Sequence, residues 1–309
     1  TLDGYSPVLY LDGKRMGLAQ GGGGYTQFGE IHCDLENSPG NPATIGIIAH
    51  EFGHDLNLPD LYDISLKTEG IGYWGLMSHG MWNRSNPTSA HYGDSPAHPT
   101  AWSRWYQGWL SPYQITSSSL DVNIPPVAIN QTVFQLRDNP FGVDWTFFES
   151  IGLGEYYLIE NRQPIGYDVG LPGFGLLIWH IDENVTASNF ANANPNNRLV
   201  DLVQADGLRQ LNLLNGNRGD PGDPFPGSTL NTIFNTDSNP SSDLYDGIIS
   251  GVSVNDIRFD ESGLSANLFV TSFEDVAPDY WSWKSIEAMK ASGLTIGCEA
   301  GQYCPGGLT

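Results

Sequence analysis

The sequence predicts an α+β protein built in three successive parts. The first part, residues 1–112, contains two helical patterns, near 42–57 and 100–107. In residues 113–271 the pattern changes to short apolar and aromatic runs between turns, which is typical of a β-sandwich-like domain. Residues 272–309 predict a short helical C-terminal module. A chain of 309 residues is long enough for two domains and such an appendage.

The first expected element is a β-hairpin. The runs Val8–Leu11 and Arg15–Leu18 flank Asp12 and Gly13, a strong turn signal. The glycines of residues 21–24 then predict a flexible loop.

The helix expected near 42–57 has a polar side and an apolar side. Asn41 suits the cap, and a proline in the first turn loses no hydrogen bond. At 100° per residue, the histidines fall on one side, and the opposite side collects Ile45, Ile48, Phe52 and Leu56. We expect the apolar side to pack and the histidine side to face a metal. Asn57 tolerates the left-handed conformation that ends such a helix.

The histidine side predicts a metal centre. His50 and His54 are four residues apart on one helix face and can therefore share a zinc ion. Glu51 falls close enough to act on a metal-bound water. A turn after the helix could bring back Asp60 as the third ligand, with the fourth position left for water. The alternative is a helix whose histidines are only solvated or hydrogen-bonded.

The remaining elements follow from shorter patterns. The second helix, near 100–107, carries Trp102, Trp105 and Tyr106 and should stop at Gly108. The β-rich part contains six candidate strands: Gln131–Leu136, Tyr156–Glu160, Gly175–Ile181, Leu199–Gln204, Gly251–Arg258 and Ala266–Thr271. His180 lies within one of them and is expected to be a packed residue.

Several separated motifs resemble the immune inhibitor A family of secreted bacterial metallopeptidases. They are His50–Asp63, the turn Gly75–Trp82, Pro99–Pro112, Glu155–Arg162, Gly175–Asp182, Gln204–Gly207 and Asp220–Pro226. The resemblance spans about residues 40–270 and implies a metzincin-like catalytic portion in residues 1–112. It also implies Zn²⁺ as the cofactor and proteins or peptides as substrates.

The resemblance assigns roles residue by residue. It makes His50, His54 and Asp60 the zinc ligands and Glu51 the general base. Met77 becomes the methionine of a turn that forms the floor beneath the metal. His79 stands where some metzincins hold a tyrosine that contacts the metal or the reacting intermediate, so it is a candidate catalytic residue. An ordinary histidine outside the site is the alternative.

The charge of the chain restricts its partners. A net charge of −22 with 13 Lys and Arg argues against binding to nucleic acid or to an anionic membrane through a basic surface. Acidity of this kind keeps a protein soluble, and it can also bind Ca²⁺ through carboxylates in loops. The candidates are Asp206, Asp220 and Asp223, with Asp243 and Asp246 nearby, although such loops are often simple turns. The sequence contains no apolar run of ~20 residues, so it predicts no transmembrane segment.

The C-terminal residues 272–309 resemble the opening of an S-layer homology module, which implies binding to bacterial cell-wall polysaccharide if the module is complete. Its helix should run over Ser282–Ala291; a helix docked on the body is the alternative. Cys298 and Cys304 are close enough for a disulfide, which suggests an oxidising compartment, whereas Cys33 is left over. The bridge should let Tyr303 and Pro305 pack on the stripe from Trp281 to Ile286.

Together these patterns predict a secreted or cell-surface zinc endopeptidase that hydrolyses peptide bonds through a water activated by Glu51. The competing hypothesis is a non-catalytic surface protein that keeps the fold for a structural or binding role. Glu51 separates the two, because a scaffold has no need of a general base beside its metal.

Overall fold

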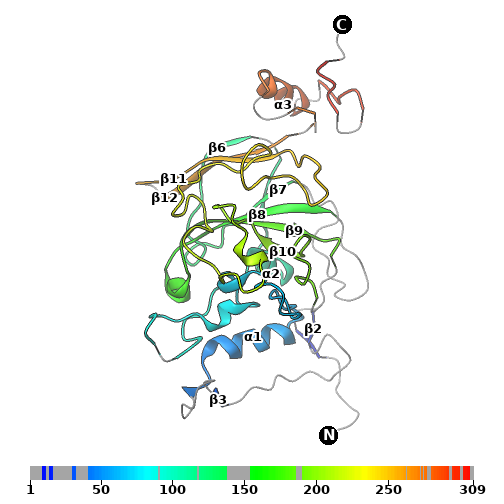
Figure 1. Ribbon diagram of the computed structural model, residues 1–309. Coiled ribbons are helices and arrows are strands. Elements are labelled where there is room, and N and C mark those ends of the chain that lie inside the picture. The colour runs from blue at the N-terminus through cyan, green and yellow to red at the C-terminus, as the bar shows by residue number, and fades with distance from the viewer. Residues whose placement is uncertain are drawn as a thin grey trace.

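The structure, a computed structural model, describes residues 9–11, 14–16, 30–32, 41–89, 91–116, 118–137, 154–185, 190–261, 263–271, 273, 275–276, 280–291, 294–299 and 302–306. Its elements lie in layers (Figure 1). Helix α1, Ile45–Asp55, lies near one end, and helix α3, Trp283–Ala291, lies at the other. Two sheets and the short helix α2, Ala101–Tyr106, lie between them. The fold is mixed α/β, with few helices among the described residues.

The N-terminal hairpin is confirmed. Strands β1, Leu9–Leu11, and β2, Lys14–Met16, pair antiparallel, whereas the turn between them and the loop expected at 21–24 lie outside the described residues. The cap expected at Asn41 and Pro42 is wrong. These two residues are strand β4, Asn41–Pro42, which pairs with β3, Ile31–His32, so helix α1 begins only after Thr44.

The packing expected for the apolar side of α1 is also wrong, although the histidine side faces the candidate metal cluster as expected. The helix buries Gly46, Ile47, His50 and Gly53, whereas Ile45 is 44% exposed and Phe52 is 49% exposed. The reason is close packing through glycine. A Cβ on Gly46 would lie 2.0 Å from the backbone oxygen of Met81. Only the glycine-lined side, which also carries the histidines, can approach the body this closely.

Helix α2 follows the prediction. Thr100 caps its N-terminus by accepting a hydrogen bond from the backbone N–H of Ser103, and Gly108 follows the helix with a φ of 71°. The rings of Trp102 and Tyr106 stack 4.9 Å apart and belong to the core between this helix and the larger sheet.

The larger sheet has five strands in the order β10-β9-β8-β7-β5. They are β5, Tyr113–Ile115; β7, Phe134–Leu136; β8, Glu155–Arg162; β9, Gly175–Asp182; and β10, Val200–Leu202. The smaller sheet has the order β11-β12-β6, with β6, Ser119–Asn123; β11, Val252–Asp260; and β12, Gly263–Val270. The six predicted strands are therefore confirmed in kind, with shifted ends.

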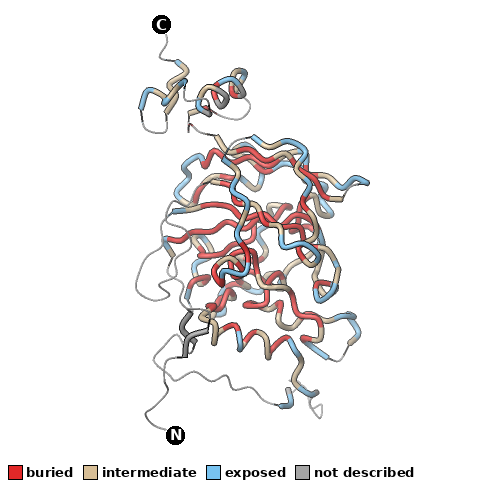
Figure 2. Tube along the Cα trace, turned by 180° about the vertical axis from the view of Figure 1, so that it is seen from behind, coloured by how far each residue is buried: buried red, intermediate tan, exposed pale blue. Residues whose placement is uncertain are grey.

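The larger sheet is covered on both faces. Every residue of β9 is buried, as is all of β8 except Glu155, and Figure 2 shows this buried band at the centre of the molecule. Side chains such as Tyr156 and Leu158 share one core with α2 and with the chain that follows α1. The alternate residues Tyr157 and Ile159 join a second core with the smaller sheet. The division into domains stays a prediction, since the first core contains residues from both sides of position 113.

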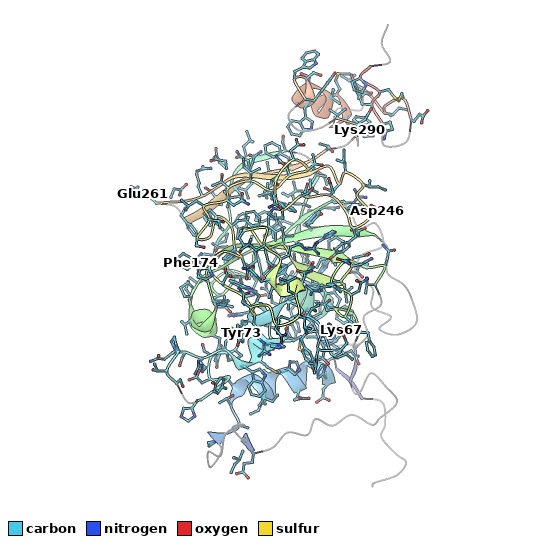
Figure 3. The ribbon with its side chains drawn as sticks, viewed as in Figure 1. Lys67, Tyr73, Phe174, Asp246, Glu261 and Lys290 are labelled. Carbon is cyan, nitrogen blue, oxygen red and sulfur yellow. A yellow bond between two sulfur atoms is a disulfide. The ribbon has the colours of Figure 1, made fainter. Side chains whose placement is uncertain are left out.

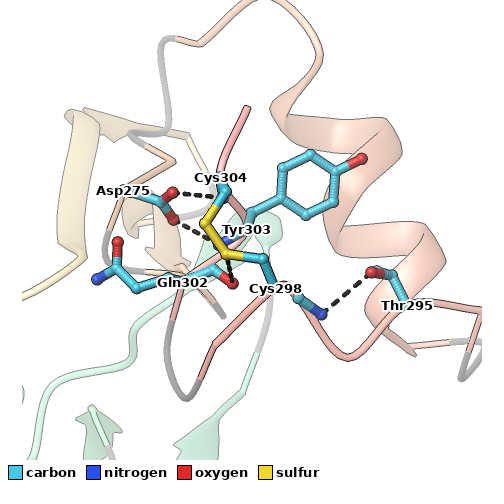
Figure 4. Close-up of a disulfide and its surroundings, with 7 residues drawn as sticks. Asp275, Thr295, Cys298, Gln302, Tyr303 and Cys304 are labelled. Carbon is cyan, nitrogen blue, oxygen red and sulfur yellow. Dashed lines mark hydrogen bonds between the residues drawn. A yellow bond between two sulfur atoms is a disulfide. The ribbon is translucent and has the colours of Figure 1, made fainter. Parts of the chain in front are cut away.

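The C-terminal residues form a small third core. Trp283 and Ile286 of α3 are each 2% exposed and pack with Phe269 and Phe273. Cys298 and Cys304 form the expected disulfide, beside Asp275, whose carboxylate accepts hydrogen bonds from two backbone N–H groups (Figure 4). Tyr303 packs against the cluster that contains Ile286, as expected, and lies against Phe273, whereas the Trp281 end of the expected stripe is wrong, because Trp281 is 87% exposed. The S-layer homology assignment stays a prediction. No helix in the described part of the chain has the length and apolarity to span a bilayer.

Candidate metal centre

Three side chains from one stretch of chain converge on a single point. Nε2 of His50 lies 3.4 Å from Oδ1 of Asp60, and Nε2 of His54 lies 3.2 Å from the same oxygen. One ligand atom from each residue lies within 4.8 Å of the other two. His50 is 2% exposed and Asp60 is 6% exposed, so the cluster is largely shielded from solvent. The structure thus brings together the three residues that the sequence predicts as metal ligands.

The end of α1 explains how Asp60 returns to the histidines. Asn57 adopts the left-handed conformation expected of it, with a φ of 64°. The chain then folds back, and the backbone N–H of Leu58 donates to the carbonyl of Gly53 over 2.9 Å. This reversal also places the carbonyl of Leu58 against the ring of His54.

Both imidazoles are oriented by backbone carbonyls. Nδ1 of His50 lies 2.9 Å from the oxygen of Leu76, and Nδ1 of His54 lies 2.9 Å from the oxygen of Leu58. Because a carbonyl oxygen can only accept, each Nδ1 carries a proton, and this leaves Nε2 of each ring as the atom that can donate its lone pair to a metal ion. Metal-binding histidines are commonly fixed in this way.

The arrangement of donors fits a cation. Oδ1 of Asp60 is buried and has no hydrogen-bond partner, although two imidazole nitrogens face it. Burial alone would raise the pKa of Asp60, but the two histidines lower it to about 2, so the carboxylate is ionised. The pKa of His54 is raised, because the attraction of Asp60 outweighs desolvation by burial. Two nitrogen donors and one carboxylate are ligands that zinc prefers.

Two further side chains lie next to this cluster. Glu51 follows His50 directly in α1, and its charge adds a smaller contribution, after that of Asp60, to raising the pKa of both His54 and Tyr62. The pKa of Tyr62 is raised to about 12 by burial, by the charge of Asp60 and by a hydrogen bond with Asp60. Its ring is stacked 6.3 Å from that of His50. Sequence reasoning missed Tyr62, although its position two residues after a ligand was a usable signal.

Met77 lies under the helix. It is 1% exposed, and a Cβ on Gly53 would lie 2.4 Å from its sulfur, so sulfur and helix backbone are in close contact. The carbonyl of Met77 accepts a hydrogen bond of 2.7 Å from the N–H of Leu61. The same turn supplies the Leu76 carbonyl that orients His50. The turn therefore supports both the helix and the segment that carries Asp60.

His79 lies beside the centre and outside the ligand cluster. Its Nε2 is 3.5 Å from a carboxylate oxygen of Glu69, and its ring lies 5.8 Å from that of Tyr62. Burial, with smaller contributions from Arg218 and His50, lowers the pKa of His79 to about 4, so the ring is neutral at pH 7. A catalytic role for His79 stays a prediction.

Buried ion pairs connect the larger sheet to the metal centre. Glu160 pairs with Arg104 of α2 and with Arg162, so it is committed to these partners and is not a metal ligand. Arg162 is completely buried and also pairs with Asp168 over 2.7 Å. It donates to the carbonyl of Trp74 over 3.4 Å, three residues before Met77. Short-range patterns could not reveal this network, because its members lie far apart in the sequence.

The predicted calcium residues divide into two groups. Asp206, Asp220 and Asp223 form a second cluster whose ligand atoms also lie within 4.8 Å of one another. Asp243 instead accepts a hydrogen bond from Thr236, and Asp246 is exposed and accepts one from the N–H of Ile248. His180 is packed, as expected, between Tyr157 and Tyr245.

Comparison with known proteins agrees with a metallopeptidase centre. Residues 26–110 match the family described as immune inhibitor A peptidase M6, catalytic domain, and this region contains α1, Asp60, Met77 and α2. The pre-pro-metalloprotease PrtV of Vibrio cholerae is 30% identical over 135 residues, 39% of this chain and 14% of that protein. Immune inhibitor A of Bacillus thuringiensis is 50% identical over 40 residues, 12% of this chain and 6% of that protein. The chain thus covers only a small part of the relatives it matches.

Proposed function

We propose that this protein is a zinc endopeptidase that hydrolyses peptide bonds in proteins. The observation that carries the proposal is the buried, unpartnered Oδ1 of Asp60 facing Nε2 of His50 and Nε2 of His54. Without a metal ion or an added proton, three electron-rich atoms would face one another in a largely buried space, which costs free energy. The match of residues 26–110 to a peptidase catalytic domain supports the assignment to proteolysis.

The residues in and around the cluster have different roles in the proposed reaction. A zinc ion held by His50, His54 and Asp60 would supply a Lewis acid, which makes water more acidic and a carbonyl more electrophilic. Glu51 accepts the proton of the attacking water and later delivers it to the departing amine. Tyr62, through its hydrogen bond, fixes the orientation of the Asp60 carboxylate.

The proposal extends to the rest of the molecule. We infer a metzincin-like arrangement for the region around α1 and Met77, and a sandwich-like arrangement for the two sheets with their common core. The Cys298–Cys304 disulfide supports an oxidising, and thus secreted or cell-surface, location. Cell-wall binding by the C-terminal residues remains a proposal that rests on motif resemblance alone.

The experiment joins metal content with proteolysis. Zinc per chain is measured by elemental analysis, and casein digestion is followed before chelation, after chelation and after zinc is restored. We expect one zinc ion at this cluster and activity that disappears and returns with it. The Asp60→Asn variant should bind zinc more weakly, whereas Glu160→Gln should change stability and leave the ligand set intact. A chain that holds zinc at these residues but never cleaves protein would favour the non-catalytic alternative.

A further inference from the structure

The second acidic cluster contains a buried atom without a partner. Asp223 is fully buried, with 0% of its surface exposed, yet its Oδ1 has no hydrogen-bond partner. Its other oxygen, Oδ2, accepts a hydrogen bond of 2.9 Å from the indole N–H of Trp74 and one of 3.0 Å from the N–H of Asp220. One half of this carboxylate is therefore satisfied, while the other half is directed at neighbouring oxygens.

The neighbouring oxygens come from Asp206 and Asp220. A Cβ on Gly222 would lie 2.9 Å from both Oδ2 of Asp206 and Oδ1 of Asp220, so the Gly222 backbone closes one side of the cluster and glycine alone fits there. The N–H of Gly222 donates to Oδ1 of Asp220 over 2.7 Å. Among the described residues, no lysine or arginine forms an ion pair with any of the three carboxylates.

The electrostatics of the cluster are unfavourable without a cation. Burial, and then the charges of Asp220 and Asp206, raise the pKa of Asp223 to about 7, although two hydrogen bonds act in the opposite direction. Binding of a proton or of a metal ion would remove the repulsion between Asp223 and the neighbouring carboxylates. The buried oxygen of Gln210, Oε1, also has no partner, while its amide nitrogen lies 3.3 Å from Oδ2 of Asp220. The donors that reach the three carboxylates, among them the amide of Asn217 and the N–H groups of Leu208 and Gly222, are all neutral, so no positive charge balances the cluster among the described residues.

We propose that Asp206, Asp220 and Asp223 bind a calcium ion that fastens the loop of residues 204–223 to the segment carrying Met77. All the available side-chain ligands are oxygens, which suits a hard cation and does not suit zinc. Asp206 and Asp220 are partly exposed, so water can complete the six to eight ligands that calcium takes. Magnesium demands a smaller, near-octahedral set and is the less suitable ion.

The loop reaches the segment that leads to Met77 through three contacts. Trp74, three residues before Met77, donates to Asp223. The N–H of Tyr73, which Figure 3 labels near α1, donates to the carbonyl of Arg218 over 2.7 Å. The guanidinium of Arg218 in turn pairs with Glu69 over 2.9 Å. A calcium ion that orders the loop would therefore also order the floor beneath the zinc ligands.

The experiment uses the whole chain loaded with zinc and dialysed into calcium-free buffer. Calcium is titrated by calorimetry, and the unfolding temperature is measured with calcium, with magnesium and with neither. We expect one calcium ion per chain in addition to zinc and a rise of several degrees, because a ligand that binds only the folded state stabilises it. Magnesium at the same concentration should give a much smaller rise. Equal rises with the two ions, or no binding of calcium at millimolar concentration, would overturn the proposal.

Variants locate the site. Asp223→Asn and Asp206→Asn should each weaken calcium binding at least tenfold and lose the rise in unfolding temperature. The control Asp246→Asn removes the same charge at a place far from Tyr73 and should behave like the unmodified chain (Figure 3). In calcium-free buffer, Asp223→Asn should be at least as stable as the unmodified chain, because it removes a buried repulsion. Lower stability of this variant without calcium, together with unchanged calcium binding by Asp206→Asn, would show an ordinary structural carboxylate. Zinc content is measured in every sample, so the result does not depend on peptidase activity.

Discussion

Gly53 and Met77 are in direct contact: a Cβ added to Gly53 would lie 2.4 Å from the sulfur of Met77. This contact holds α1 against the turn whose carbonyl groups orient His50 and bind the N–H of Leu61, the residue after Asp60. A second glycine of the helix, Gly46, makes an even closer contact, 2.0 Å from its Cβ position to the Met81 carbonyl oxygen. Because Gly46 and Gly53 have no side chains, α1 can pack this closely against the rest of the molecule at both positions.

The two glycines should respond differently to alanine. By helix propensity, each substitution would stabilise the protein by ~1 kcal/mol. At Gly46 the obstacle is backbone, so we expect Gly46→Ala to destabilise the protein by about 1–3 kcal/mol. Gly53→Ala should cost less, because the Met77 side chain can move. Urea unfolding of both variants checks this, and a Gly46→Ala protein as stable as its parent would contradict the packing described.

Glu51 should be needed for proteolysis and dispensable for metal binding. Glu51→Gln keeps the size of the side chain but cannot accept a proton, so we expect at least ~100-fold slower peptide hydrolysis with zinc content unchanged. The matched control is Asp55→Asn, which changes the other carboxylate of α1 and should retain most of the activity. Near-normal turnover by the zinc-loaded Glu51→Gln variant would exclude this residue as the general base.

Tyr62 should act as a positioning residue for the third ligand. Tyr62→Phe removes the hydroxyl that hydrogen-bonds to Asp60, and partners of metal ligands typically contribute 10–100-fold to metal affinity. We expect zinc affinity to fall within about that range, measured by competition with a chelator. Tyr73→Phe is the control, because the Tyr73 ring contacts His79 and no ligand ring. Equal zinc affinities in the two variants would remove Tyr62 from the centre.

The buried Arg162 should be critical for stability. Arg162→Met leaves Glu160 and Asp168 buried without their shared partner, and losing one member of a buried pair typically costs about 3–5 kcal/mol. Arg258 also pairs with carboxylates, but its pairs are exposed, so Arg258→Met should have no measurable effect. Chemical denaturation of the two variants makes the comparison, and similar losses in both would refute it.

The Asp168 carboxylate should contribute to acid lability. Burial raises its pKa, but Arg162 and His98 outweigh this and hold the pKa well below the ordinary value. Its stabilising contribution is therefore complete above the unfolded pKa of ~3.9 and is lost as the pH falls below it. We expect the unfolding free energy to decline in this range with a shallower slope in Asp168→Asn. Parallel pH profiles for the two proteins would show that Asp168 is not responsible.

Local signals predicted the parts of the centre that depend on local geometry. The four-residue spacing of His50 and His54 puts both on one helix face, and Asn57 adopts the left-handed turn expected of it. The periodicity shows which residues share a face of α1 but not which face is covered, and the expected burial of Phe52 is therefore wrong. Tertiary packing through Gly46 decided that question.

Long-range contacts were beyond sequence reasoning. Asn41 has a propensity to cap a helix, but in the structure it pairs with His32 of the neighbouring strand instead. The hydrogen bond from Trp74 to Asp223 joins residues 149 positions apart, and no short pattern announces it. The acidic composition predicts calcium candidates in this loop, but only the folded structure shows that one oxygen of Asp223 is buried without a partner.

Strand β8 sets a strict limit on how the chain can change in length. Its successive residues alternate between the two cores, so Leu158 and Ile159 belong to opposite halves of the molecule. Inserting one residue ahead of them would send each side chain to the other face. Glu160 would then turn away from Arg104 while apolar side chains exchanged cores. Insertions and deletions that this protein can survive must therefore fall outside this strand, or occur in pairs that restore its alternation.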